Sequence, residues 1–289
     1  MDLVTTKKRR RDRRLTDPQP MRLTARDVEI VEAVHQYRVL RQDQIQGLFF
    51  SSKNAAQRAL ARLYDHGFLE RKFLPVLYGR SPTLYVLDKR GADLLRSQRG
   101  YEHLIWYSSS KDLKIDFIEH TTALNDFRVS IVVAARRRGL NLTTWASESQ
   151  LKADYDRVRI ADSRQPVSVI PDGYFVLDTP KGEAHCFVEV DRGTETLQRF
   201  KQKVSAYIAY HESGGYERRY GTRSLRILTI ATGEGRLANL RAATRQEVEG
   251  TRGRQRFWFA LASDLTPETV LSEPVWYLAE EETPRALIA

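Results

Sequence analysis

The sequence predicts an α+β protein in which a small helical domain with a β-hairpin precedes a larger α/β domain with a mixed central sheet flanked by helices. Three observations predict this fold class. Apolar residues recur at helical spacing in three short segments before Gly67, a hairpin pattern follows them, and a strand–turn–strand unit near 168–191 leads into a helical pattern. The expected parts are a disordered basic arm at 1–20, the small domain at 21–98, a linker at 99–113, the large domain at 114–279 and a peripheral acidic tail at 280–289.

Composition points to a soluble protein that binds polyanions. The chain has 289 residues and a formal net charge of +10, with a pI of about 9.7. Such a balance favours nucleic acid as partner, the alternative being a basic surface that only keeps the protein soluble. No apolar run approaches the about 18 residues of a membrane span, and the N-terminus lacks the apolar segment of a secretion signal. The single cysteine, Cys186, fits a reducing cytoplasm.

The first twenty residues form a basic segment with almost no core-forming side chains. Lysines and arginines fill most of the stretch 7–14, and Asp17-Pro18-Gln19-Pro20 follows. This composition predicts disorder. The arm would either contact phosphates without regard to sequence or remain a solvated tail with no specific role.

The next segment has the element order of a winged helix-turn-helix. Thr24 can cap a first helix, with Asp27 three residues later in the capping-box position. Gly67 stops the third helix. The second helix is expected at 41–49 and the third at 53–66. The wing is expected as a strand at 68–73, a tip at 78–82 and a return strand at 83–87.

The exposed side chains of the third helix and the wing predict binding of double-stranded DNA. Asparagine and glutamine can read adenine edges, and arginine can read guanine or contact phosphate. The expected DNA-binding residues are Lys53, Asn54, Gln57, Arg58, Arg62, Arg71, Lys72 and Arg80. Winged helices also serve as protein-interaction modules, in which case this polar face is merely solvated. A homodimer is a further expectation, because many winged helices read paired half-sites.

The larger domain begins with a long helix and continues mainly with strands. The segment 151–165 is polar and without period, so an irregular insertion is expected there. The other expected elements are a helix at 114–138, strands at 141–147, 168–177, 184–191, 224–231 and 257–260, and helices at 195–211 and from about 236 to 248.

Carboxylates occupy unusual places in the two central strands of this domain. Side chains alternate along a strand, so Glu189 and Asp191 project to one face, and Asp172 lies on the neighbouring strand. Burying a charge is costly unless it is paired or binds a metal. Carboxylate oxygens suit a hard divalent cation, which predicts a site for Mg²⁺ or Mn²⁺.

These residues resemble the PD-(D/E)xK nuclease motif, with Pro171-Asp172 followed by Glu189-Val190-Asp191. The resemblance implies a restriction-endonuclease-like core in which Asp172 and Glu189 hold the metal. Asp191 stands where the family has its lysine. Some relatives carry that lysine on the following helix, where Lys203 is the first candidate, Lys201 the second, and Tyr207 lies one turn after Lys203. The resemblance also implies Glu148 as a ligand, unless it is a surface glutamate at a strand end.

More narrowly, the run F-V-E-V-D-R-G-T-E-T at 187–196, with Lys203 and Tyr207, resembles the replication-relaxation family over about 23–230. The polar positions His120 and Asn125-Asp126 also resemble that family. The resemblance implies a plasmid or mobile-element protein with a winged helix ahead of a nuclease-like core, similar to plasmid mobilisation relaxases.

Two functions follow as hypotheses. The first is a replication or mobilisation protein that nicks or relaxes DNA, for example at a plasmid or mobile-element origin. Its metal ligands would be Glu148, Asp172, Glu189 and Asp191, with Lys203 and Tyr207 completing the catalytic set. The second is a non-catalytic DNA-binding accessory factor or transcriptional regulator with a degenerate nuclease-like domain. Asp191 in the lysine position favours the second, and the retained acidic residues favour the first.

Overall fold

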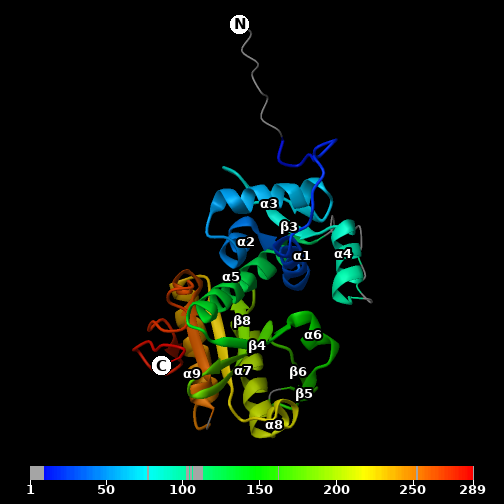
Figure 1. The fold of residues 1–289 in the computed structure, drawn as a ribbon. Helices are drawn as coiled ribbons and strands as arrows, with labels where there is room; N and C mark the ends of the chain where they lie inside the picture. The colour runs from blue at the N-terminus through cyan, green and yellow to red at the C-terminus, as the bar shows by residue number, and fades with distance from the viewer. Residues whose placement is uncertain are drawn as a thin grey trace. The chain divides into compact units, whose positions relative to one another are not determined.

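The computed structural model describes residues 10–76, 78–101, 104, 106, 113–161, 163–251 and 253–288. The chain divides into two compact units, Met1–Asp126 and Phe127–Ala289 (Figure 1). The division falls inside helix α5 (Ile115–Arg137), later in the chain than the expected linker at 99–113. Within the described ranges, no helix combines the length and apolar character needed to span a membrane.

The first unit contains helices and a small antiparallel sheet with strand order β1-β3-β2. Thr24 caps the first helix as expected: its hydroxyl oxygen accepts from the Asp27 N–H (3.2 Å), and an Asp27 carboxylate oxygen accepts from the Thr24 N–H (3.0 Å). Gly67 ends the third helix region with a φ of +76°, which favours glycine. The elements are α1 (Ala25–Tyr37), β1 (Leu40–Arg41), α2 (Gln42–Phe49), α3 (Lys53–Asp65), β2 (Leu69–Lys72), β3 (Leu84–Leu87) and α4 (Lys89–Arg99).

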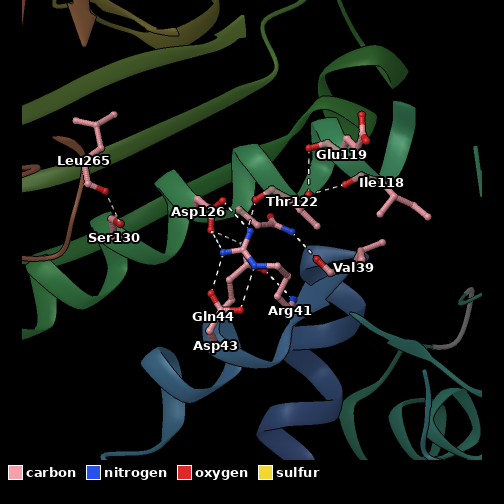
Figure 2. Close-up of polar contacts among 11 residues, drawn as sticks. Val39, Arg41, Asp43, Gln44, Ile118, Glu119, Thr122, Asp126, Ser130 and Leu265 are labelled. Atoms are coloured by element: carbon pink, nitrogen blue, oxygen red, sulfur yellow. Dashed lines mark hydrogen bonds and ion pairs between the residues drawn. The ribbon is translucent and has the colours of Figure 1, made fainter. Parts of the chain in front are cut away.

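The first half of α5 is attached to the rest of this unit by buried and partly buried polar contacts. Asn125 donates from its side-chain amide to the carbonyl oxygens of Tyr37 (3.0 Å) and Val39 (2.6 Å). The guanidinium of Arg41 contacts both carboxylate oxygens of Asp126, at 2.9 and 2.6 Å (Figure 2). These contacts give Asn125 and Asp126 a structural role, because each satisfies a polar group that folding removes from water.

The described part of the N-terminal arm contacts other residues of the first unit. Arg14 pairs with Glu70 at 2.8 Å and also with Asp88. Arg11 lies over the Phe73 ring, with its guanidinium carbon 4.7 Å from the ring centroid. Carboxylates and aromatic rings elsewhere in the unit thus give these arginines partners that composition alone does not reveal. Residues 1–9 of the arm lie outside the described residues.

The described part of the second unit contains a mixed six-stranded sheet with strand order β11-β10-β9-β8-β7-β4. β7 pairs antiparallel with both β4 and β8, β9 and β10 continue parallel to β8, and β11 is antiparallel to β10. Helix, three antiparallel strands, helix and parallel strand is the order expected for the restriction-endonuclease-like core, so the predicted α+β class with a mixed sheet flanked by helices is confirmed. The strands are β4 (Asn141–Ser147), β7 (Gly173–Thr179), β8 (Gly182–Asp191), β9 (Arg226–Ala231), β10 (Phe257–Leu261) and β11 (Tyr277–Leu278).

The two faces of this sheet pack against different helices. On one face Phe175 contacts Phe127 from the second half of α5, with ring centroids 5.9 Å apart. On the other face Phe187 contacts Tyr207 from helix α7 (Leu197–Glu212), at 5.6 Å. Alternation along β8 therefore directs Glu189 and Asp191 toward α7 and helix α9 (Glu234–Val248).

Two expectations for this unit are wrong. The segment 151–165 is not irregular throughout, because it contains the end of the short helix α6 (Glu148–Ala153) and the strand β5 (Asp156–Val158), which pairs with β6 (Val167–Val169). The tail is not peripheral: Leu287 is buried, and the Ile288 N–H donates to the Leu271 carbonyl (2.9 Å). The remaining short helices are α8 (Gly215–Tyr220), η2 (Arg254–Arg256) and η3 (Ala262–Asp264).

Candidate functional site

Glu189 is the centre of a buried polar cluster near the end of β8. Only 4% of the residue is exposed. One of its carboxylate oxygens accepts a hydrogen bond from Lys203 Nζ at 3.0 Å, and the other accepts from the Tyr207 hydroxyl. Lys203 and Tyr207 are four residues apart on α7, so both side chains reach the same point on the sheet. The structure thus brings together three of the residues that the sequence singled out.

Asp172 lies beside this cluster, just before β7. Its backbone N–H donates to the Val188 carbonyl (3.0 Å), and its carboxylate accepts from the Val190 N–H (2.8 Å). Asp172 is therefore fixed to the two residues of β8 that flank Glu189. The Asp172 charge is one of the causes that raise the pKa of Glu189, as expected for neighbouring carboxylates.

Lys203 is the cation that faces the carboxylates of this cluster. Burial raises the pKa of Glu189 to about 7, although the charge of Lys203 and the hydrogen bonds from Tyr207 and Lys203 act in the opposite direction. The carboxylates of Glu189, Asp172 and Glu195 raise the pKa of Lys203, which stays protonated. Glu195 lies 3.3 Å from the Lys203 ammonium. Glu195 belongs to the run 187–196 but was not among the predicted site residues.

Asp191 occupies a different environment from Glu189. The guanidinium of Arg236, from the first turn of α9, donates to both Asp191 carboxylate oxygens, at 2.8 and 2.7 Å. The Gly193 N–H is a third donor, at 2.8 Å. Arg236 also donates to the Glu195 carbonyl (2.7 Å). Asp191 is thus a buried partner of Arg236, which sequence reasoning missed, and Lys203 supplies the cation beside Glu189.

The other expected members of the site point elsewhere. Glu148 begins α6, and its carboxylate pairs with Lys152 one turn later. Lys201 Nζ donates to the Gln246 side chain at 2.6 Å. In the described ranges of the chain, no three or more His, Cys, Asp or Glu side chains form a group that could hold a metal ion. The expected set of four carboxylates is therefore reduced to the pair Asp172 and Glu189.

This pair fits Mg²⁺ or Mn²⁺ in one respect. Mg²⁺ is usually bound through one or two carboxylates, with waters and substrate phosphates as its other ligands. A further polar group faces the same side: Thr229 lies opposite Glu189 in the β8–β9 register and is 1% exposed. Its hydroxyl has no hydrogen-bond partner among the described residues. Buried polar groups are normally paired, so this hydroxyl fits a site with a water or ligand.

The acid–base state of Glu189 gives a testable pH dependence. Its pKa is raised from 4.5 to about 7 in the folded chain, so the folded state binds more protons than the unfolded state between these values. The free energy of unfolding, relative to Glu189→Gln, is therefore expected to fall as pH rises from about 4.5 through 7. Urea unfolding of both proteins at several pH values measures this difference. A difference that stays constant or grows with pH contradicts the assignment.

Of the side chains expected to bind DNA, most are exposed, and Arg62 and Arg71 contact other residues of the first unit. Lys53, Asn54, Gln57 and Arg58 are exposed, and Arg80 is exposed at the wing. Arg62 pairs with the buried Asp27 at 3.3 Å. The guanidinium of Arg71 covers the Tyr64 ring at 4.2 Å, and Lys72 is half-buried. The guanidinium of Arg71 thus packs against Tyr64 from the preceding helix, and its contact with DNA stays a prediction.

The second unit is therefore an α/β domain of restriction-endonuclease-like element order, with a buried Glu–Lys–Tyr cluster and an adjacent aspartate. A model of the family described as replication-relaxation matches residues 31–225. The chain belongs to the replication-relaxation family, as its sequence resemblance implied, and by this membership it is a replication-related protein.

The solved structures that are similar to the chain include two of restriction endonuclease FokI. One is restriction endonuclease FokI bound to DNA, at 13% identity and a TM-score of 0.28, covering 83% of this chain and 43% of that chain. The other is restriction endonuclease FokI, at 12% identity and a TM-score of 0.26, covering 83% and 42%. The chain thus spans less than half the length of the FokI chains. No curated protein matches the chain.

Proposed function

We propose that the chain is a DNA-binding replication or mobilisation protein of a plasmid or mobile element, and that it nicks or relaxes DNA at a metal-dependent site. Asp172 and Glu189 form this site. The observation that carries the proposal is the 3.0 Å contact between Lys203 and Glu189. Through this contact, Lys203 on α7 takes the place of the lysine that the motif lacks at Asp191.

The residues of the site have separate roles in this proposal. Asp172 and Glu189 would hold Mg²⁺ or Mn²⁺, which when bound activates a nucleophile and stabilises the leaving oxygen. The Lys203 ammonium would orient the nucleophile or offset charge on the scissile phosphate. Tyr207 holds the Glu189 carboxylate in place. Burial and the Glu189 charge raise the pKa of Tyr207, which keeps its hydroxyl protonated and favours a positioning role over a nucleophilic one.

The experiment that tests this function is nicking of supercoiled plasmid that carries the native flanking DNA. Wild type, Asp172→Ala and Glu189→Ala are compared in Mg²⁺, Mn²⁺ and EDTA. Relaxation that requires metal and is lost in both variants is the expected result. Glu148→Gln serves as the control. Because Glu148 pairs with Lys152, this variant is expected to retain activity. Salt-sensitive DNA binding without cleavage in any metal contradicts the nicking function.

A second candidate function is supported by the enclosure of Glu189. Both of its carboxylate oxygens already accept hydrogen bonds, and the described residues form no larger ligand group. A nuclease-like domain held together by such contacts suits a non-catalytic accessory factor or transcriptional regulator. Cleavage without dependence on Asp172 and Glu189 contradicts both candidates.

Double-stranded DNA is the proposed partner, with the first unit acting as a winged helix-turn-helix. The exposed face of α3 carries Lys53 and Arg58. Arg58→Ala is expected to weaken specific binding by about 1–3 kcal/mol if it reads a base. Lys53→Ala is expected to weaken binding to all sequences and to lower the salt dependence by about one phosphate contact.

Lys89→Ala is the matched control for these variants. Lys89 is also an exposed lysine of the first unit, but it begins α4 instead of α3. Fluorescence anisotropy of a labelled duplex at several salt concentrations measures all three affinities. Equal losses in Lys53→Ala and Lys89→Ala contradict a specific role for the α3 face, because they indicate a dependence on net charge alone.

A further inference from the structure

A cavity of about 290 Å³ lies in the second unit beside the C-terminal half of α7. Its apolar wall comes from three elements: Ile208 on α7, Ile227 on β9 and Phe257 on β10. Its polar lining includes Arg223, which follows α8 in the chain, and Arg256, which is the last residue of η2. The volume is near the lower end of the range typical of small-ligand pockets.

The charged groups of this cavity favour an anion. The lining residues include two arginines, Arg223 and Arg256, and one carboxylate, Glu212; the exposed Arg223 side chain also pairs with Glu217 at 3.5 Å. Arg256 is half-buried, and both its burial and the charge of Arg223 lower its pKa. Two nearby arginines repel each other, and an anion between them removes that repulsion. Arginine is also the side chain whose planar donors match a phosphate group.

The position of Arg223 is fixed by α7. The His211 ring Nε2 lies 3.0 Å from the Arg223 carbonyl oxygen, and burial lowers the pKa of His211, which keeps the ring neutral. A neutral ring can bond the carbonyl only by donating from Nε2. The segment after α8 is thereby tied to the helix that forms one wall of the cavity.

We propose that this cavity binds the phosphate of a nucleotide, with Arg223 and Arg256 on the phosphate and the apolar wall against the sugar or base. The apolar residues explain why a nucleotide, rather than inorganic phosphate, suits the space. The ligand is a free nucleoside monophosphate or the 5′-terminal nucleotide of a DNA strand, which share this chemistry. Tyr207 lines the cavity and donates to Glu189, so a bound nucleotide would touch the cluster from its other side. The inference does not rest on the proposed nicking function.

Isothermal titration calorimetry of the full chain in EDTA tests the proposal. The probes are deoxyadenosine 5′-monophosphate, deoxyadenosine, inorganic phosphate, and a single-stranded trinucleotide with or without a 5′-phosphate. We expect saturable binding of the monophosphate or of the phosphorylated trinucleotide, and weaker binding of inorganic phosphate, deoxyadenosine and the unphosphorylated trinucleotide. Whichever of the two binds more tightly identifies the source of the phosphate. Absence of saturable binding by both overturns the proposal.

Arginine variants locate the binding. Arg256→Met is expected to weaken binding roughly 10- to 100-fold, the size of a lost charge-assisted hydrogen bond. Arg223→Met is expected to weaken it by a smaller factor, because 67% of the Arg223 side chain is exposed. Arg254→Met is the matched control: this arginine is also in η2, is exposed and pairs with Glu280 at 3.6 Å. Binding that persists in the Arg223 and Arg256 variants, with unchanged thermal unfolding, overturns the assignment.

Discussion

Replacing Glu189 with glutamine is expected to abolish metal-dependent nicking while the affinity for DNA remains unchanged. Glutamine keeps the size of the side chain and an oxygen for the Lys203 donor, but it removes the charge that a divalent cation requires. The expected loss in rate is on the order of 100-fold or more, because even partners outside the metal's direct ligands contribute 10- to 100-fold. Plasmid nicking rates and duplex affinities of the same preparation measure the two quantities.

A second substitution tests the part of Lys203 in the same cluster. Lys203→Met removes the cation but keeps both carboxylates, and the Glu189 pKa is then expected to rise further, because the Lys203 charge now lowers it. Nicking is expected to fall in both variants, and the Glu189 pKa in Lys203→Met is expected to be higher than in the wild type. Full activity of Glu189→Gln contradicts the assignment of Glu189 as a metal ligand.

Replacing Arg236 with methionine is expected to destabilise the second unit by about 3–5 kcal/mol, as happens when one partner of a buried ion pair is removed. The Asp191 side chain is 4% exposed, so its charge would remain buried with the Gly193 N–H as donor. Urea unfolding followed by tryptophan fluorescence measures the change. Trp145, Trp258 and Trp276 all lie in the second unit.

Two comparisons make this prediction specific. The double variant Asp191→Asn with Arg236→Met is expected to recover part of the loss, because no uncompensated charge stays buried. Arg137→Met breaks an exposed pair with Glu268 and is expected to change stability by less than about 1 kcal/mol. If Arg236→Met left stability unchanged, Asp191 would not depend on Arg236 and its assignment as a metal ligand would have to be reconsidered.

Local patterns in the sequence were sufficient for much of the fold and the centre of the site. Period-two alternation in β8 put Glu189 and Asp191 on one face, and the i, i+4 spacing on α7 put Lys203 beside Tyr207. Both patterns concern neighbours within one element. The mixed sheet flanked by helices followed from the order of such elements.

The partners that sequence reasoning missed are distant in the chain. Arg236 is 45 residues from Asp191, and the two meet only because β9 runs parallel to β8 and delivers α9 to the same face. The packing of Arg71 on Tyr64 and the contacts of Arg11 and Arg14 are likewise tertiary. No local periodicity encodes such contacts.

Glu148 is a different case, because its partner was visible in the sequence. Lys152 follows it at i, i+4, the spacing at which a glutamate and a lysine pair on a helix. The resemblance to the nuclease motif favoured a strand end at this position. The capping box of Ser147 and Gln150, which begins α6, was the local signal for a helix.

Binding of Mn²⁺ to wild type and to Asp172→Asn, followed by electron paramagnetic resonance with and without a DNA duplex, tests the central claim most directly. The expected result is one bound Mn²⁺ per chain in the wild type, displaced by Mg²⁺ and lost in Asp172→Asn. Asp172 lies beside Glu189 and accepts a hydrogen bond from the Val190 N–H. The side-chain oxygen of asparagine can accept the same bond, so the variant should fold. Absence of bound Mn²⁺ in wild type with and without DNA, or equal binding in the variant, would contradict a metal site at Asp172 and Glu189.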